Sequence, residues 1–206
     1  MFAEAQKALA DFNKELKGGS KAASAAATDV KRYYDATRTD AEKYADGLKV
    51  HINKYRWIEY SLSSSIMLIV IMQLNGTADY IALLSIFAVN VCMILFGWLQ
   101  ERYAKPGSGD MLPFWFGCVA GSIPWIAIFI NMLSPSGPPE TTVPGFVVGI
   151  VISLFVFFNC FAIVQWKQYR ANGKWADYLY GERWYIILSF VAKSLLAWQV
   201  FAGALV

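Results

Sequence analysis

The stretch GFVVGIVISLFVFFNCFAIVQW at residues 145–166 decides the fold, because none of its 22 residues is Asp, Glu, Lys, Arg or His. An α-helix rises about 1.5 Å per residue, so a run of this length crosses the roughly 30 Å of hydrocarbon in a bilayer. A helix on the surface of a soluble protein would instead carry polar residues along one face. The stretch therefore predicts a membrane-spanning helix.

Four more apolar runs of similar length accompany this one, and turn-forming or polar segments such as Asn75-Gly76 and Pro106-Gly107 separate them. The repeated length predicts an all-α membrane protein, a bundle of five transmembrane helices. The five predicted spans are residues 57–74, 80–99, 112–133, 145–166 and 184–206.

The composition of the chain agrees with a lipid environment. Hydrophobic residues make up 57% of the 206 residues and charged residues 16%, whereas about 25% is charged in an average soluble protein. A small globule exposes too much surface to hide so much apolar mass from water. The lipid bilayer is the predicted partner. A net charge of +3 does not indicate nucleic acid.

Three cysteines and a single histidine offer no ligand set for a metal. No nucleophile lies beside a base at a spacing that indicates an enzyme.

Charged residues concentrate at the amino end, where residues 1–57 hold 19 of the 33 Asp, Glu, Lys and Arg residues. This density predicts a polar, soluble helical segment at residues 1–50, followed by a transmembrane domain at 51–206. Within the segment, helical spacing of apolar residues predicts a helix at 4–16. A linker at 20–27 and a second helix at 29–48, with Thr28 as its N-cap, are expected to follow.

The connections between spans differ in charge, and this difference predicts the orientation. Seventeen of the 18 Lys and Arg residues fall in the amino-terminal region or in the second-to-third and fourth-to-fifth connections, which share one face. The opposite face has none. By the positive-inside rule, the amino end is cytoplasmic, the carboxyl end is outside, and the chain is a multi-pass protein of the cell membrane.

Two ionisable residues, Glu59 and Lys193, fall inside the predicted spans. A charge at the bilayer centre costs on the order of 2.5–3.5 kcal/mol, so such residues indicate function or pairing. At about 1.5 Å per residue, Glu59 lies about 24 Å and Lys193 about 18 Å from the outer ends of their helices. The two side chains can meet if the first and last spans are neighbours.

Three interpretations of this pair remain open. Glu59 and Lys193 can form a structural ion pair, or they can line the conduction path of an ion channel or small transporter. Alternatively, a desolvated lysine amine is a good nucleophile for a carbonyl and forms a Schiff base. A protonated Schiff base in lipid would need a carboxylate counter-ion such as Glu59.

Several strings resemble, in order, the third to seventh transmembrane helices of the heliorhodopsin family. The resemblance covers residues 52–204 and is specific, because unusual strings recur in sequence rather than one short motif. The strings are NKYRWIEYSLSSS at 53–65, ILFGW at 94–98, PFWFG at 113–117 followed by IPW at 123–125, SLFVFFNC at 153–160 with GKWADY at 173–178, and SFVAKSLLAW at 189–198.

This resemblance implies a light-responsive, retinal-binding membrane protein that acts as a sensor rather than an ion pump. All-trans retinal would be bound covalently to Lys193 as a protonated Schiff base, with Glu59 as counter-ion. Ser64 and Ser189 would lie near the Schiff base. The resemblance also implies dimerisation, hence a homodimer. The residues that would line or support the polyene slot are Asn90, Met93, Gly97, Pro124, Phe158 and Trp198.

The chain departs from the family at its amino end. Heliorhodopsins have seven transmembrane helices, and polar helices stand here in place of recognisable first and second ones. A third hypothesis therefore remains beside the photoreceptor and the channel. It is a truncated membrane scaffold without pigment, whose residues 1–50 recruit a cytoplasmic protein partner.

Overall fold

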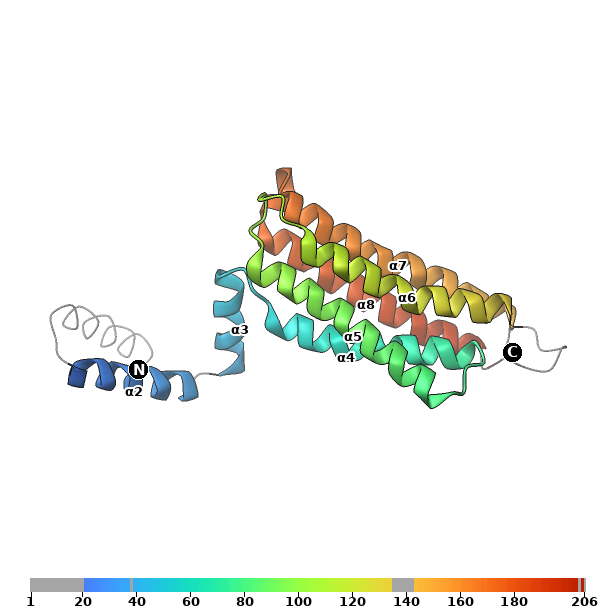
Figure 1. Cartoon of the computed structure of the whole chain (residues 1–206), viewed down its shortest axis with the longest axis horizontal. Coiled ribbons are helices and arrows are strands. Elements are labelled where there is room, and N and C mark those ends of the chain that lie inside the picture. Colours follow the sequence, from blue (N-terminus) through green and yellow to red (C-terminus); the bar gives the residue numbers. More distant parts are fainter. Residues whose placement is uncertain (1–20, 38, 135–142, 204, 206) are drawn as a thin grey trace. The chain divides into compact units, whose positions relative to one another are not determined.

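A computed structural model describes residues 21–37, 39–134, 143–203 and 205 of the chain. Within these residues the chain forms seven α-helices and one short 3-10 helix, η2 (Figure 1). The chain divides into two compact units between residues 47 and 48. The helices are α2 Lys21–Thr37, α3 Asp40–Lys49, α4 Lys54–Leu74, α5 Tyr80–Tyr103, α6 Leu112–Leu133, α7 Gly145–Arg170, η2 Gly173–Ala176 and α8 Tyr178–Gly203.

The amino-terminal helices differ from the predicted ones. The helix predicted at 4–16 lies outside the described residues. The linker predicted at 20–27 is wrong from Lys21 onward, because this alanine-rich stretch forms the first turns of α2. Thr28 is therefore not an N-cap but lies inside α2, where its hydroxyl donates a hydrogen bond to the Ser24 carbonyl at 2.9 Å.

The single helix predicted at 29–48 is also wrong, since α2 ends at Thr37 and α3 begins at Asp40. A reciprocal cap explains the break. The Thr39 amide donates to Glu42 Oε2 at 3.0 Å, and the Glu42 amide donates to Thr39 Oγ1 at 3.4 Å. This is a capping box, which starts a new helix at the residue after the threonine.

The prediction of five membrane-spanning helices is confirmed, because α4 to α8 are each long and apolar enough to cross a bilayer. Four of them extend beyond their predicted apolar runs, α4 by three residues at its start and α5 by four at its end. The helix α7 continues past Trp166 to Arg170, and α8 begins at Tyr178 instead of residue 184. The early start of α8 has a physical reason, since Tyr178, Glu182 and Tyr185 turn inward and are buried.

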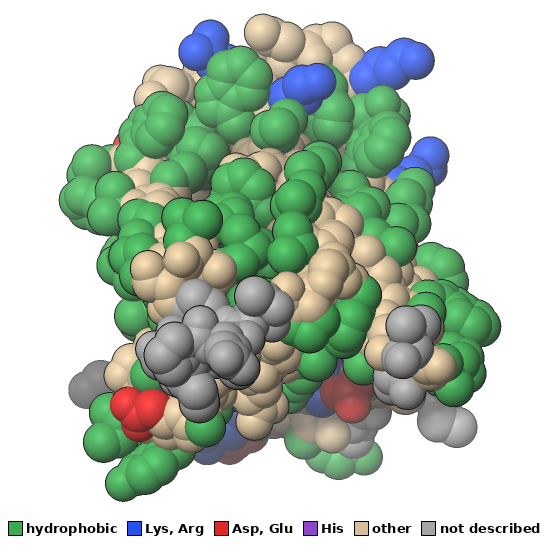
Figure 2. Space-filling model, turned by 90° about the vertical axis from the view of Figure 1, so that its right-hand side faces the viewer, with side chains coloured by type: hydrophobic (Ala, Val, Ile, Leu, Met, Phe, Trp, Pro, Cys, Tyr) green, Lys and Arg blue, Asp and Glu red, His purple; other side chains and the backbone are tan. Residues whose placement is uncertain are grey.

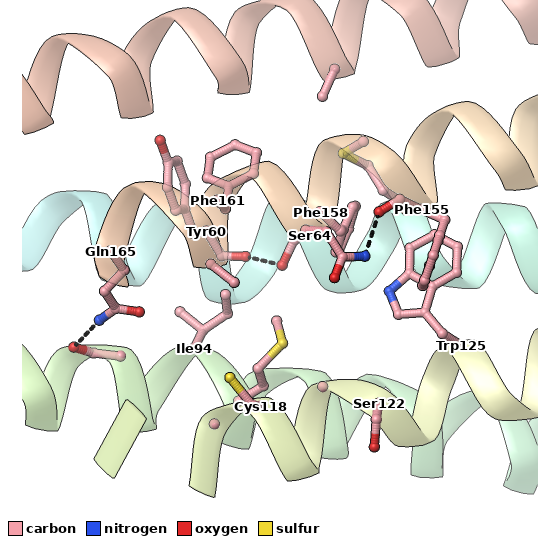
Figure 3. A pocket seen from close by; sticks show the side chains of 18 of the residues that line it. Tyr60, Ser64, Ile94, Cys118, Ser122, Trp125, Phe155, Phe158, Phe161 and Gln165 are labelled. Carbon is pink, nitrogen blue, oxygen red and sulfur yellow. Dashed lines mark hydrogen bonds between the residues drawn. The ribbon is translucent and has the colours of Figure 1, made fainter. Parts of the chain in front are cut away.

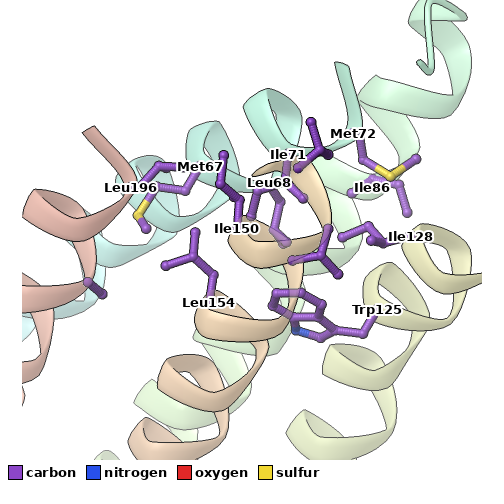
Figure 4. Close-up of a cluster of buried hydrophobic side chains, with 13 residues drawn as sticks. Met67, Leu68, Ile71, Met72, Ile86, Trp125, Ile128, Ile150, Leu154 and Leu196 are labelled. Atoms are coloured by element: carbon purple, nitrogen blue, oxygen red, sulfur yellow. The ribbon is translucent and has the colours of Figure 1, made fainter. Parts of the chain in front are cut away.

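The five long helices run side by side as a bundle (Figure 1). The helix α5 packs against both α4 and α6, while α7 packs along α8. A core of hydrophobic side chains joins all five long helices near one end of the bundle (Figure 4). Its fully buried members are Leu68 and Ile71 from α4, Ile128 from α6, and Val147, Ile150, Val151 and Leu154 from α7.

Asparagine side chains close the same end of the bundle. Asn75, at the end of α4, is 2% exposed and donates through Nδ2 to the Ile128 carbonyl at 2.8 Å. In return, Asn131 Nδ2 on α6 donates to the Asn75 carbonyl at 2.6 Å. The turn residue Asn75 thus also ties α4 to α6, which satisfies polar backbone groups that would otherwise be left unpaired.

The outer surface of the bundle is apolar over most of its length. Large side chains such as Leu84 and Phe190 are 67% and 72% exposed. Figure 2 shows hydrophobic side chains over most of the visible face, with Lys and Arg side chains at its upper edge and further charged side chains at its lower edge. An apolar surface of this extent suits contact with lipid, and the fold is that of a multi-pass membrane protein.

Replacing Leu154 by Ala tests the buried core. Because Leu154 is fully buried, the substitution leaves a cavity, and we expect it to lower the free energy of unfolding by about 2–5 kcal/mol. Unfolding of the detergent-solubilised chain measures the change. The control is Leu84→Ala on the exposed face, which should change stability by about 0.5 kcal/mol or less. Equal losses in the two variants would contradict the assignment of the core.

Candidate functional site

A cavity of about 440 Å³ lies between the five long helices, and all five contribute to its wall. This volume is within the roughly 300–1,000 Å³ typical of small-molecule sites. Two groups of aromatic side chains stand in its wall (Figure 3). Tyr60 and Phe161 lie together at an edge-to-face contact of 5.5 Å, and the second group surrounds Trp125. The cavity is therefore suited to a long apolar ligand.

The second aromatic group is built around a buried tryptophan. The ring of Trp125 on α6 meets Phe155 and Phe158 of α7 edge to face, with centroid distances of 5.2 and 5.3 Å. Pro124 comes directly before it, inside α6, and is itself buried. Edge-to-face contacts fix the angle between rings, so this end of the cavity has defined walls.

A glycine on α5, Gly97, leaves space for the Trp57 ring in another wall of the cavity. A Cβ atom at Gly97 would lie 2.5 Å from Cζ3 of the Trp57 ring, which is closer than two carbons can approach. Glycine therefore lets the indole of α4 pack directly on the α5 backbone. Met93, one turn earlier on α5, lines the same cavity.

Lys193 from α8 lines the cavity and forms an ion pair with Glu59 from α4. The two side chains are 37% and 47% exposed, so the pair lies at the edge of the bundle. The Tyr60 ring lies 5.6 Å from the lysine nitrogen, at a distance typical of a cation–π contact. The amine therefore has access both to the cavity and to a carboxylate outside it.

Both predicted serines line the cavity, and Asn90 forms a hydrogen bond with one of them. Ser64 and Ser189 both face it. The Ser64 hydroxyl donates to the Tyr60 carbonyl at 2.6 Å and accepts from Asn90 Nδ2 at 2.8 Å. Asn90 also donates to Ser65 Oγ at 2.9 Å and is 1% exposed. Asn90 therefore supports the wall instead of lining it.

The remaining predicted residues divide between the cavity and the surface. Met93, Gly97 and Phe158 line the cavity, and Pro124 stands behind Trp125. Trp198 is not among the residues that line the cavity. Its side chain is 69% exposed and packs against Phe201, with a distance of 5.9 Å between the ring centroids. Five residues separate it from Lys193, which at about 3.6 residues per turn places the two on different faces of α8.

The cavity opens toward the surface between α6 and α7. Ser122 and Ile126 on α6 combine an exposed side chain with a place in the cavity wall, and so do Phe155 and Asn159 on α7. The Asn159 side chain is held by a hydrogen bond of 2.8 Å to the Phe155 carbonyl. Because this surface is apolar, the opening faces lipid in a membrane.

A buried cluster of three charges lies beside the cavity and was missing from the sequence-based candidates. Arg56 Nη2 donates to Glu101 Oε1 at 2.7 Å, and Arg56 also forms an ion pair with Glu182. All three side chains are at most 4% exposed. The cluster joins the first turn of α4 to the last turn of α5 and to the start of α8.

Neutral donors complete the cluster. The Tyr178 hydroxyl donates to Glu101 Oε1 at 2.8 Å, and the Trp57 indole N–H donates to Glu101 Oε2. The side chain of Asn53 donates to Glu182 Oε2 at 2.8 Å. Among the residues that the structure describes, no group of three His, Cys, Asp or Glu could hold a metal ion.

A sequence signal for this cluster exists, but it is weak. Arg56, Glu101 and Glu182 each lie within two residues of an apolar run, and all three ends belong to the same predicted face of the membrane. Charges at the ends of spans are usually solvated, so position alone does not single them out. The pairing becomes visible only when the three helix ends are brought together.

Comparison with known proteins gives one finding and one negative result. A family model described as heliorhodopsin matches residues 32–205, well over half of the chain. The match begins within α2, ahead of the strings that carry the resemblance, and it includes α3 and all five long helices. No curated protein matches the chain.

Replacing Arg56 by Gln tests the buried charges. The substitution leaves Glu101 and Glu182 buried without their counter-charge, so we expect the free energy of unfolding to fall by about 3–5 kcal/mol. Denaturant unfolding in detergent measures it, with Arg102→Gln at an exposed site as the matched control. Stability equal to that of the control would show that the cluster does not hold the helix ends together.

Proposed function

The chain belongs to the heliorhodopsin family, and on that premise we propose that it binds retinal covalently through Lys193, as a Schiff base with Glu59 as counter-ion. The family supports the general statement of a light-responsive, retinal-binding membrane protein. The attachment site, the counter-ion and a role as a sensor rather than a pump are our proposal.

The proposal rests on the position of the Lys193 amine in the wall of the cavity. Lys193 is the only Lys or Arg among the described residues that line the cavity of about 440 Å³. An amine that is removed from water in an apolar pocket is a good nucleophile for an aldehyde carbon. The cavity thus brings together an apolar volume and one group able to bind a polyene aldehyde.

The residues around the cavity fit such a ligand. Retinal, when bound, supplies the absorption of visible light. Trp125 and Phe158 offer flat apolar walls at one end of the cavity, and Met93 and Gly97 line it from α5. Ser189 lies one helical turn before Lys193, on the same face of α8, so its hydroxyl is near the attachment point.

Glu59 is proposed to balance the positive charge at the attachment point. A cation inside a membrane domain needs a nearby anion, because hydrocarbon does not solvate it. Glu59 already forms an ion pair with the Lys193 amine. The two buried carboxylates beside the cavity are engaged elsewhere, Glu101 with Arg56, Trp57 and Tyr178, and Glu182 with Arg56 and Asn53. This leaves Glu59 as the acid for the role.

We also propose a topology and a division of the chain. The amino end and the connections rich in Lys and Arg face the cytoplasm, and the carboxyl end lies outside. Residues 1–50 form a polar helical segment before a transmembrane domain at residues 51–206.

Reconstitution with all-trans retinal tests the attachment site. We expect the wild-type chain to develop a visible absorption band that hydroxylamine abolishes, and we expect no band from Lys193→Ala, which lacks the amine. Lys105→Ala, at an exposed site outside the cavity, is the control and should retain the band. A wild-type chain without any visible band would contradict the proposal. Light-independent ion flux abolished by Glu59→Gln would then favour the channel.

The counter-ion is tested by Glu59→Gln. Removing the carboxylate withdraws the negative charge that holds the positive charge near the nitrogen, so the absorption maximum of the pigment should move to longer wavelength. A visible spectrum of the reconstituted variant measures the shift, with Asp110→Asn in an exposed connection as control. An unchanged maximum would show that another group balances the charge.

A further inference from the structure

A second, smaller groove lies at the carboxyl end of α7, apart from the large cavity. Its volume is about 220 Å³, and five side chains line it without any acidic residue among them. Two indole rings and two cations dominate this wall. The lining residues are Trp166, Lys167, Arg170, Asn172 and Trp175.

The two cations of the groove are held on aromatic rings and not by carboxylates. Lys167 Nζ lies 5.5 Å from the centre of the Trp175 ring, and Arg170 Cζ lies 4.9 Å from that of Trp166. No carboxylate in the described part of the chain forms an ion pair with either one. Their charges therefore remain available to an anion.

The walls of the groove are fixed by backbone and ring contacts. Ala171 ends α7 in the left-handed region at φ 51°, and its amide donates to the carbonyls of Lys167 and Gln168 at 3.2 Å. Trp175 is held by an edge-to-face contact of 5.0 Å with Tyr180 and by stacking on Trp184 at 6.5 Å. The cations thus stand on a preformed surface.

The position of the groove matches the headgroup level of a membrane. Trp166 is the last residue of the apolar run 145–166 and is 37% exposed, as is typical of tryptophans at the membrane interface. Val156 and Ile163 precede Arg170 at intervals of seven residues, so the three share one face of α7. Val156 and Ile163 are 54% and 49% exposed. An apolar strip therefore leads along α7 to a cationic groove.

We propose that this groove binds the phosphate headgroup of an anionic phospholipid, whose acyl chains lie on the exposed apolar strip of α7. The two cations and the Asn172 amide meet the phosphate, while the indoles border the glycerol region. The groove is smaller than typical small-molecule pockets, which suits a headgroup whose chains remain outside it. This binding is independent of any ligand in the large cavity.

The test is native mass spectrometry of the full chain in detergent with added phosphatidylglycerol or phosphatidylcholine. Each cation near an anionic headgroup strengthens binding about fivefold. We expect the double variant Lys167→Gln, Arg170→Gln to bind phosphatidylglycerol about 30-fold more weakly than wild type. The control pair Lys54→Gln, Arg102→Gln removes the same charge outside the groove and should leave binding unchanged.

Two further measurements separate loss of charge from loss of fold, and lipid binding from binding of free phosphate. The charge-preserving pair Lys167→Arg, Arg170→Lys should retain phosphatidylglycerol, which separates loss of charge from loss of fold. Inorganic phosphate at the lipid concentration should not displace the lipid, because it cannot use the apolar strip. Equal binding by wild type and the double variant, equal binding of both lipids, or displacement by inorganic phosphate would each overturn the proposal.

Discussion

The arrangement of this bundle depends on the two buried ion pairs that Arg56 forms with Glu101 and Glu182. Hydrocarbon offers no water to solvate a charge or a free hydrogen-bonding group, so each must find its partner within the protein. Arg56 meets this requirement by joining the first turn of α4 to the end of α5 and the start of α8. With these ends fixed, α4 and α8 lie close enough for Glu59 and Lys193 to meet, and the space between the five helices remains as a cavity.

The spans could be predicted from sequence because each is a long apolar run with at most one charge, and both ends of α6 match the predicted run, but the start of α8 could not be predicted in this way. Glu182 shows the reason. Its neighbours in sequence place Glu182 in a solvated loop. It lies instead in the helix, because Arg56 of α4 and the N-cap residue Asn53 pair with its carboxylate. Local composition does not contain that partner. At the amino end, by contrast, the missed break after Thr37 had a local signal in Thr39 and Glu42, which form a capping box.

The candidate site was predictable to a similar degree. Depth along the helices was enough to bring Glu59 and Lys193 into reach of each other, since both positions follow from counting residues. The direction of a side chain was harder: Trp198 lies close to Lys193 in sequence but on another face of α8, exposed to the surroundings. The cavity itself depends on packing between distant residues, such as the Trp57 ring against Gly97, and no single segment encodes it.

The indole of Trp57 belongs to two environments at once. One side of the ring lines the apolar cavity, while its nitrogen is a donor to the buried carboxylate of Glu101. A displacement of this ring that moves its nitrogen away from Glu101 would withdraw a donor from that carboxylate. A change in the shape of the apolar cavity would thereby alter the electrostatic environment of Glu101 at the end of the bundle, although no charged group has moved.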